Sequence, residues 1–202
     1  MITTKKFNEI FEKTIEEYHI KDDVNQEFKS KYPENSLEYL LHKKNWIDTV
    51  QWHLEDIIRE PSINPEKALE IKRRIDKSNQ DRTDLVETID DYFFEQFKNV
   101  QPLPDAFINT ETPAWAVDRL SILNLKIYHM RQEAERKDAD EEHRNKCSFK
   151  LKVLLQQRED LSLAIEQLFD MLKKGKAVIK TYKQMKMYND PNLNPVLRKS
   201  NK

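Results

Sequence analysis

The sequence predicts an all-α fold: a single-domain bundle of five or six mostly long helices, with a central apolar fourth helix and an extended C-terminal tail. Apolar residues recur at spacings of three and four, which is the period of a helix. Charged residues make up 35% of the chain, as is typical of long amphipathic helices. The single glycine argues against phosphate loops, Rossmann turns and sheets with tight hairpins, because these need glycine at positive φ or at close backbone contacts.

The N-terminal part of the chain predicts two helices separated by a polar loop. The first helix covers residues 3–20 and the loop covers residues 21–34. Asn35, with Glu38 three residues later, has the pattern of a capping box that opens the second helix. This helix extends to about Glu60, where a proline follows and stops it.

Trp52 is the unusual residue of the second helix. At 100° per residue it points away from the apolar face of that helix. We therefore expect a second neighbour, an interface or a ligand wall at this tryptophan.

The third helix begins at Asn64-Pro65, a capping residue followed by proline at the first helical position, and extends to about Lys98. Polar residues interrupt the centre of its apolar seam. Four acidic residues recur at helical spacing on the opposite face, which is also the pattern of a metal-binding stripe, and we interpret them as a solvated face. They are Asp84, Glu87, Asp91 and Glu95.

Two further helices complete the predicted bundle. The fourth covers residues 112–137 and is apolar nearly all round, which is typical of a central helix. The fifth is capped by Asp138 or Asp140 and reaches Lys174. Gly175 follows directly and is a strong helix stop.

The last part of the chain differs from the rest in charge. We expect a helical bundle over residues 1–175 and a basic tail over residues 176–202, either docked on the bundle or free. A short helix through Met187 is predicted in the tail, and two Asx-Pro pairs then predict an extended end.

The totals of the sequence exclude several classes of partner. The formal net charge is −1, so we expect neither a nucleic acid nor a membrane as partner. Cys147 is the only cysteine, which suits a reducing compartment, and we interpret it as a small core residue. No secretory signal pattern and no long apolar run occur, so a soluble, cytoplasmic protein is expected.

Three arginines on the predicted apolar faces of three helices are the main functional signal: Arg82, Arg119 and Arg158. A buried guanidinium is costly unless its donors are satisfied. One interpretation is pairing with nearby carboxylates such as Asp118. The other is a pocket for a phosphate- or carboxylate-bearing ligand, since Arg binds such groups with two parallel hydrogen bonds. The further ligand-binding residues of this hypothesis are Ser78, Asn79, Lys72 and His53.

Histidines and acidic residues give a weaker metal signal. His53 with Asp56, and His129 with Glu133, are pairs at helical spacing that could contribute metal ligands. A di-metal bundle needs Glu-x-x-His twice together with two further glutamates, and no helix has that pattern. From the sequence we therefore assign no metal site, no cofactor and no catalytic residue.

Four long segments of the sequence stand out: NWIDTVQWHLEDIIREP, IKRRIDKSNQDRTDLVE, NTETPAWAVDRLSILNLKIYHM and YKQMKMYNDPNLNPVL, which together span residues 45–197. These segments resemble an uncharacterised bacterial family catalogued as domain of unknown function 4254. The resemblance implies a soluble bacterial all-helical protein and supplies no activity. It also implies a genomic setting beside cell-envelope glycosyltransferases, and hence a link to cell-envelope sugar metabolism.

Two functional hypotheses remain open at this point. The first is a non-enzymatic module that binds an anionic small molecule, a protein partner or a second copy of the chain, through the Trp52 face or the tail. The second is a metal-dependent enzyme similar to the all-helical nucleotide pyrophosphohydrolases, using carboxylates such as Glu55, Asp56, Asp84, Glu87 and Asp90. The sequence does not decide whether the protein is an enzyme.

Overall fold

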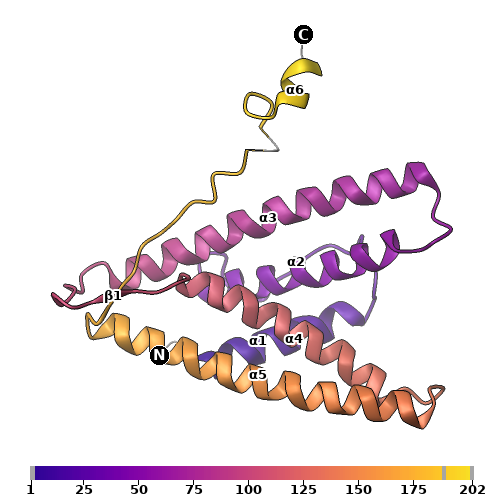
Figure 1. Ribbon diagram of the computed structural model, residues 1–202, viewed down its shortest axis with the longest axis horizontal. Helices are drawn as coiled ribbons and strands as arrows, with labels where there is room; N and C mark the ends of the chain where they lie inside the picture. The colour runs from indigo at the N-terminus through magenta and orange to yellow at the C-terminus, as the bar shows by residue number, and fades with distance from the viewer. Residues whose placement is uncertain (1–2, 188–189, 201–202) are drawn as a thin grey trace.

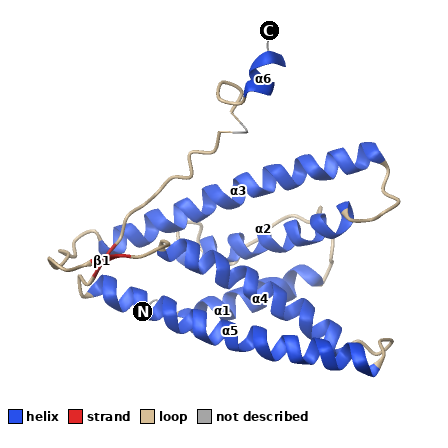
Figure 2. Ribbon diagram, in the orientation of Figure 1, coloured by secondary structure: helices blue, strands red, loops and turns tan. Residues whose placement is uncertain are grey.

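The computed structural model describes residues 3–187 and 190–200 and confirms the all-α fold (Figure 1). The first five helices form one bundle, and the two strands are a minor feature beside it (Figure 2). The elements in the described residues are α1 (Thr4–His19), α2 (Leu37–Ile58), α3 (Pro65–Phe97), β1 (Phe107–Ile108), α4 (Pro113–Glu135), α5 (Glu141–Lys173), β2 (Ala177–Val178) and α6 (Pro195–Ser200).

Helix α4 is central, as its composition predicts. It packs against α1, α2, α3 and α5, so nearly its whole circumference is covered. The long helices α3 and α5 lie on opposite sides of the bundle and converge at the end that carries β1 (Figure 1). There the rings of Phe93 and Phe97 pack against Phe169.

Side-chain caps fix where most helices begin. The side chain of Asn64 accepts hydrogen bonds from two backbone N–H groups at the start of α3. At the start of α4, the side chain of Thr112 accepts one from the backbone N–H of Trp115. Asp140 is the cap of α5. The predicted cap of α2 was wrong by one residue, because Ser36, not Asn35, accepts the hydrogen bond from the backbone N–H of Tyr39 at 3.1 Å.

Gly175 ends α5 in a conformation that suits glycine. Its φ is +68°, and a Cβ atom at this position would lie 2.5 Å from the carbonyl oxygen of Gln101. The tight turn lets the chain return beside the β1 segment, where Ala177 pairs in parallel with Phe107. This two-residue pairing was not predicted from the sequence.

The tail corrects three predictions. Residues 179–187 have no regular secondary structure, so the short helix through Met187 was wrong, and α6 forms where an extended end was expected. The acidic stripe of α3 is also not merely solvated, because Lys183 Nζ lies 3.0 Å from the Asp91 carboxylate. The backbone N–H of Gln184 donates to Glu87 Oε1 at 2.8 Å. The tail therefore follows α3 before α6 projects beyond the bundle (Figure 1).

Within the described residues, no helix combines the length and the apolar composition that crossing a membrane requires.

Candidate functional site

The three arginines singled out in the sequence occupy three different surroundings. The side chain of Arg82 is about a quarter exposed and forms a bidentate salt bridge with Asp118. Its Nη2 lies 2.6 Å from Oδ2, and its Nε lies 3.1 Å from Oδ1. Arg158 pairs with Glu12 and also donates to Asn124 Oδ1 at 3.1 Å. Pairing with carboxylates therefore occupies both guanidinium groups.

Arg119 is a correction to the predicted apolar seam. Its side chain is 59% exposed and pairs with Glu111 at 2.6 Å. Because α4 is apolar nearly all round, its sequence pattern did not define a single buried face, and Arg119 lies on the strip left open to solvent. Arg82 and Arg158 line separate cavities, one between α2, α3 and α4 and the other between α1 and α5, so the arginines do not converge.

The other residues of the anion-binding hypothesis are also engaged. Asn79 and Ser78 exchange hydrogen bonds with Gln51 of α2, at 2.9 and 3.0 Å. Lys72 pairs with Asp76 on the exposed face of α3. The contacts of Gln51 join α2 to α3. Of these four further residues, only His53 lies in a group of titratable side chains.

A buried ionic cluster joins Arg82 to the centre of the bundle. Lys44 is fully buried and pairs with Asp48. Its Nζ also lies 2.8 Å from Asp118 Oδ1. Ser121 donates its hydroxyl to Asp48 Oδ2 at 2.6 Å. Two cations and two carboxylates cancel, so the cluster is a neutral network that ties α2, α3 and α4 together. The Lys44–Asp48 spacing of four residues was the signal in the sequence that could have found it.

Three histidines from three helices meet at one end of the bundle, and the sequence alone did not predict this. His19 ends α1, His53 lies in α2 and His129 lies in α4. His53 Nε2 is 3.2 Å from His19 Nε2. One ring nitrogen from each histidine can be chosen so that all three lie within 4.8 Å of one another.

Aromatic rings hold each imidazole in place. Tyr18 stacks on His53 with ring centroids 5.1 Å apart, and Trp52 stacks on His129 at 4.8 Å. Tyr128 packs against His19 at 4.3 Å. The expected second neighbour of Trp52 is therefore His129, and its stacking restricts the orientation of that ring.

The hydrogen bonds of the cluster leave an acceptor nitrogen on His19 that faces His53. His19 Nδ1 lies 2.7 Å from the carbonyl oxygen of Ile15, which places the proton of neutral His19 on Nδ1 and leaves Nε2 as an acceptor. Burial, together with His19 and His53, lowers the pKa of His129 to about 4, and burial lowers the pKa of His53. His129 Nε2 is buried without a hydrogen-bond partner. Burial thus favours the neutral imidazole at His53 and His129, and neutral imidazole is the form that binds metal ions.

Asp22 places a carboxylate beside this cluster. Its Oδ1 lies 3.6 Å from His53 Nε2, and its side chain is 57% exposed. The residue has a φ of +50° directly after α1, a conformation that Asp adopts more readily than most residues. The loop therefore brings an acidic oxygen to the solvent side of the three histidines.

No second group of this kind was found in the part of the chain that the structure describes. The histidine cluster is the one set of three or more His, Cys, Asp or Glu side chains there whose ligand atoms converge. Cys147 is buried, as predicted, and its sulfur lies 3.4 Å from His143 Nε2.

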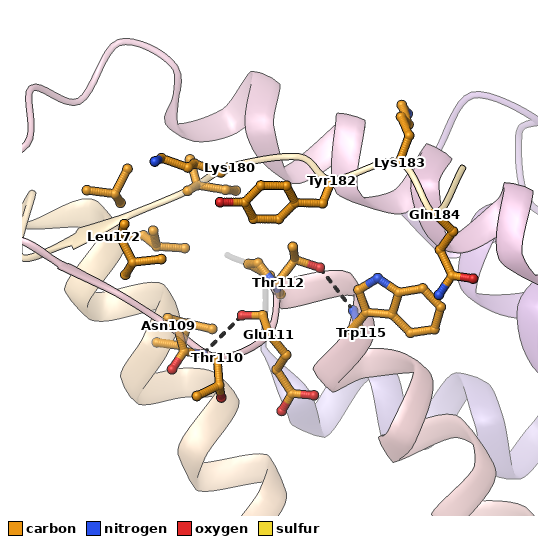
Figure 3. A pocket seen from close by; sticks show the side chains of 15 residues that line it. Asn109, Thr110, Glu111, Thr112, Trp115, Leu172, Lys180, Tyr182, Lys183 and Gln184 are labelled. Carbon is orange, nitrogen blue, oxygen red and sulfur yellow. Dashed lines mark hydrogen bonds between the residues drawn. The ribbon is translucent and has the colours of Figure 1, made fainter. Parts of the chain in front are cut away.

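A separate cavity of about 370 Å³ lies beneath the tail (Figure 3). Tyr182 covers it from one side and Trp115 forms part of the opposite wall (Figure 3). Two of the charged groups that line it are paired, Glu111 with Arg119 and Lys183 with Asp91. The cavity thus offers space and aromatic surface, with the exposed Lys180 as a further charged group among its lining residues.

Comparison with known proteins identifies the family but no activity. A family model described as "Protein of unknown function (DUF4254)" matches residues 38–181. No curated protein and no solved structure matches the chain. The matched region contains His53 and His129, whereas His19 and Asp22 precede it. Because the match covers most of the sequence and agrees with the resemblance seen in its polar segments, the chain belongs to the DUF4254 family of proteins of unknown function.

Proposed function

We propose that this protein binds one divalent transition-metal ion through the Nε2 atoms of His19, His53 and His129. The convergence of three imidazole nitrogens from three helices is the observation that carries this proposal. Imidazole nitrogen is a preferred ligand of Zn²⁺, Cu²⁺, Ni²⁺ and iron, and the all-histidine donor set fits zinc well.

The spacing of the nitrogens suits such an ion. Two nitrogens bound tetrahedrally to zinc at about 2.0–2.1 Å are about 3.4 Å apart, and the His19–His53 separation is 3.2 Å. The largest separation in the group is no more than 4.8 Å, so small rotations of the rings would complete the site. The hydrogen bond from His19 Nδ1 to the Ile15 carbonyl oxygen is the outer contact that metal-binding histidines commonly make.

A fourth position remains for Asp22 or for water. Three protein ligands with one open position are the arrangement of catalytic zinc sites, in which the ion lowers the pKa of bound water to about 7. The exposure of Asp22 supports solvent access on that side. The proposal is a metal-binding function; the chemistry that a bound ion would perform is a separate question.

Calorimetric titration with Zn²⁺ and visible absorption with Co²⁺ test the proposal directly. The wild-type chain is expected to bind one equivalent, and His19→Ala, His53→Ala and His129→Ala are each expected to weaken binding by at least about tenfold. His143→Ala is the matched control, because His143 lies on α5 beside Glu133 and outside the cluster. Equal affinity in all four variants and the wild type would overturn the proposal.

The hypotheses of an anion-binding module and of a pyrophosphohydrolase have less support. Arg82, Arg119 and Arg158 each face a carboxylate of this chain, which reduces their attraction for an external anion. Of the acidic residues named for the enzyme, Asp90 accepts hydrogen bonds from Thr112 and Ala114 at the start of α4.

A further inference from the structure

The cavity of about 370 Å³ beneath the tail is formed by parts of the chain that are far apart in sequence. Residues between Ile108 and Trp115 line one side, and residues between Val178 and Gln184 line another. Its volume lies within the range of about 300–1,000 Å³ that is usual for small-molecule sites. The three clustered histidines do not line it, so a ligand here would be independent of the proposed metal centre.

Two aromatic side chains line this cavity, and neither has an aromatic partner. Tyr182 lies over it on the tail, and Trp115 forms part of the opposite wall (Figure 3). Among the described residues, neither ring packs against another aromatic ring. Tyr182 is also 59% exposed, so a ligand beneath it would remove apolar surface from water. A flat aromatic group suits this space, because contact between rings stabilises a complex beyond the area that it buries.

The cavity is elongated and has an apolar lining between its two ends. Figure 3 shows Lys180 and Leu172 at the end away from Trp115, with Tyr182 over the middle. Leu172 belongs to α5, and Ile179 of the tail adds a further aliphatic side chain to the lining. A ligand that spans the cavity therefore needs an apolar portion between its aromatic end and its other end.

Lys180 is the charged lining residue that forms no ion pair with any described residue. The other charged groups of the lining are engaged by the chain itself. Glu111 pairs with Arg119 at 2.6 Å, which neutralises the one carboxylate. Lys183 pairs with Asp91 at 3.0 Å. The exposed Lys180 therefore leaves a single positive charge for a ligand, and a single negative charge near it is the complement.

The tail closes the cavity through contacts on the exposed face of α3. Lys183 contacts Asp91, and the backbone N–H of Gln184 donates to Glu87. Ion pairs at such exposed positions contribute little to stability. Separating this part of the tail from α3 is therefore inexpensive, and it gives a ligand access to the cavity.

We propose that this cavity binds an aromatic carboxylate, with its ring between Trp115 and Tyr182 and its carboxylate, carried on a short aliphatic chain, at Lys180. The ammonium group of Lys180 donates charge-assisted hydrogen bonds, which a carboxylate accepts. The aliphatic chain would pack against Leu172 and Ile179. The proposal does not depend on the metal centre, because none of its ligand contacts involves the histidine nitrogens.

Calorimetric titration of the metal-free chain with 4-phenylbutyrate, at physiological salt and with a chelator present, tests the proposal. Phenylbutyrate is expected to bind with one-to-one stoichiometry. Phenylbutylamine has the same ring and chain with the opposite charge, and it is expected to bind at least about fivefold more weakly. Cyclohexylbutyrate keeps the charge without the aromatic ring, and it is expected to bind about threefold more weakly.

Two variants of exposed tail residues locate the binding. Lys180→Met is expected to weaken phenylbutyrate binding by about fivefold, as for the loss of one accessible ion pair. Tyr182→Leu is expected to weaken it by about threefold, because the contact between rings is lost. Lys176→Met is the matched control, since Lys176 is an exposed lysine of the same segment that does not line the cavity.

Binding that is unchanged in Lys180→Met, or equally weakened in Lys176→Met, would overturn the proposal. It would also be overturned if phenylbutylamine or cyclohexylbutyrate bound as tightly as phenylbutyrate, or if phenylbutyrate did not bind at millimolar concentration.

Discussion

The Nε2 atoms of His19 and His53 lie 3.2 Å apart, although 34 residues separate the two histidines in the chain. Such an approach leaves at most one proton between the two nitrogens. A cation at this point satisfies both lone pairs together with that of His129, which is buried without a partner. A bound metal ion would therefore replace that proton, give His129 Nε2 a partner, and join α1, α2 and α4.

Metal binding should stabilise the folded chain measurably. Zinc at a hundred times its dissociation constant contributes about 2.7 kcal/mol to the free energy of unfolding, which is roughly 5–10 °C in Tm for a chain of this size. Thermal melts with zinc and with a chelator measure the difference. The shift is expected to disappear in His129→Ala and to persist in His143→Ala. A shift of the same size in both variants would place the ion elsewhere.

Removing Lys44 should destabilise the bundle strongly. Lys44 is fully buried between Asp48 and Asp118, so Lys44→Met leaves an excess of buried negative charge and should cost about 3–5 kcal/mol. The double variant Lys44→Met/Asp48→Leu removes a cation and an anion together and should recover much of that loss. Urea denaturation of the three proteins gives the free energies. A single variant as stable as the wild type would show that the network is not energetically coupled.

The pH dependence of stability should depend on His42. This side chain is 2% exposed, and burial is the main cause of its lowered pKa. Because the unfolded chain binds the proton more readily, stability is expected to fall as the pH decreases below about 6.5, by at most about 1.4 kcal/mol per pH unit from this group. Denaturation at pH 7.5 and 5.5 measures the effect. His42→Gln should show a smaller decrease than the wild type, and an identical decrease would contradict the assignment to His42.

Gly175 should not tolerate a side chain. Gly175→Ala places a Cβ atom 2.5 Å from the Gln101 carbonyl oxygen at a φ of +68°, and a cost of about 1–3 kcal/mol is expected. Lys174→Ala, one residue earlier at a φ of −87°, is the matched control and should change stability by less than about 0.5 kcal/mol. Chemical denaturation distinguishes the two, and equal stabilities would show that the turn relaxes freely.

Local sequence signals predicted most of the fold. The Asn64-Pro65 and Thr112-Pro113 starts, the Gly175 stop and the apolar circumference of α4 each depend on residues close together in the chain, and the structure confirms them. The path of the tail was not predictable in this way. Its position along α3 depends on contacts such as Lys183 with Asp91, which are 92 residues apart.

The candidate site depended on tertiary structure to a greater extent. Periodicity placed His53 and His129 on helices but did not indicate that His19, at the end of α1, would meet them. It also placed Arg119 in an apolar seam, since a helix that is apolar nearly all round has no single buried direction. Pairs of residues at helical spacing can be predicted from the sequence alone. Predicting a site that is assembled from three helices requires knowing how those helices are positioned relative to one another.

X-ray absorption spectroscopy of the chain loaded with one equivalent of zinc tests the metal centre most directly. The spectrum is expected to show imidazole scattering from three histidines, with zinc–nitrogen distances of about 2.0–2.1 Å and one further nitrogen or oxygen ligand. His19→Ala, His53→Ala and His129→Ala should each remove one imidazole from the zinc shell. A shell with fewer than three imidazoles in the wild type, or one that these substitutions leave unchanged, would contradict the three-histidine site.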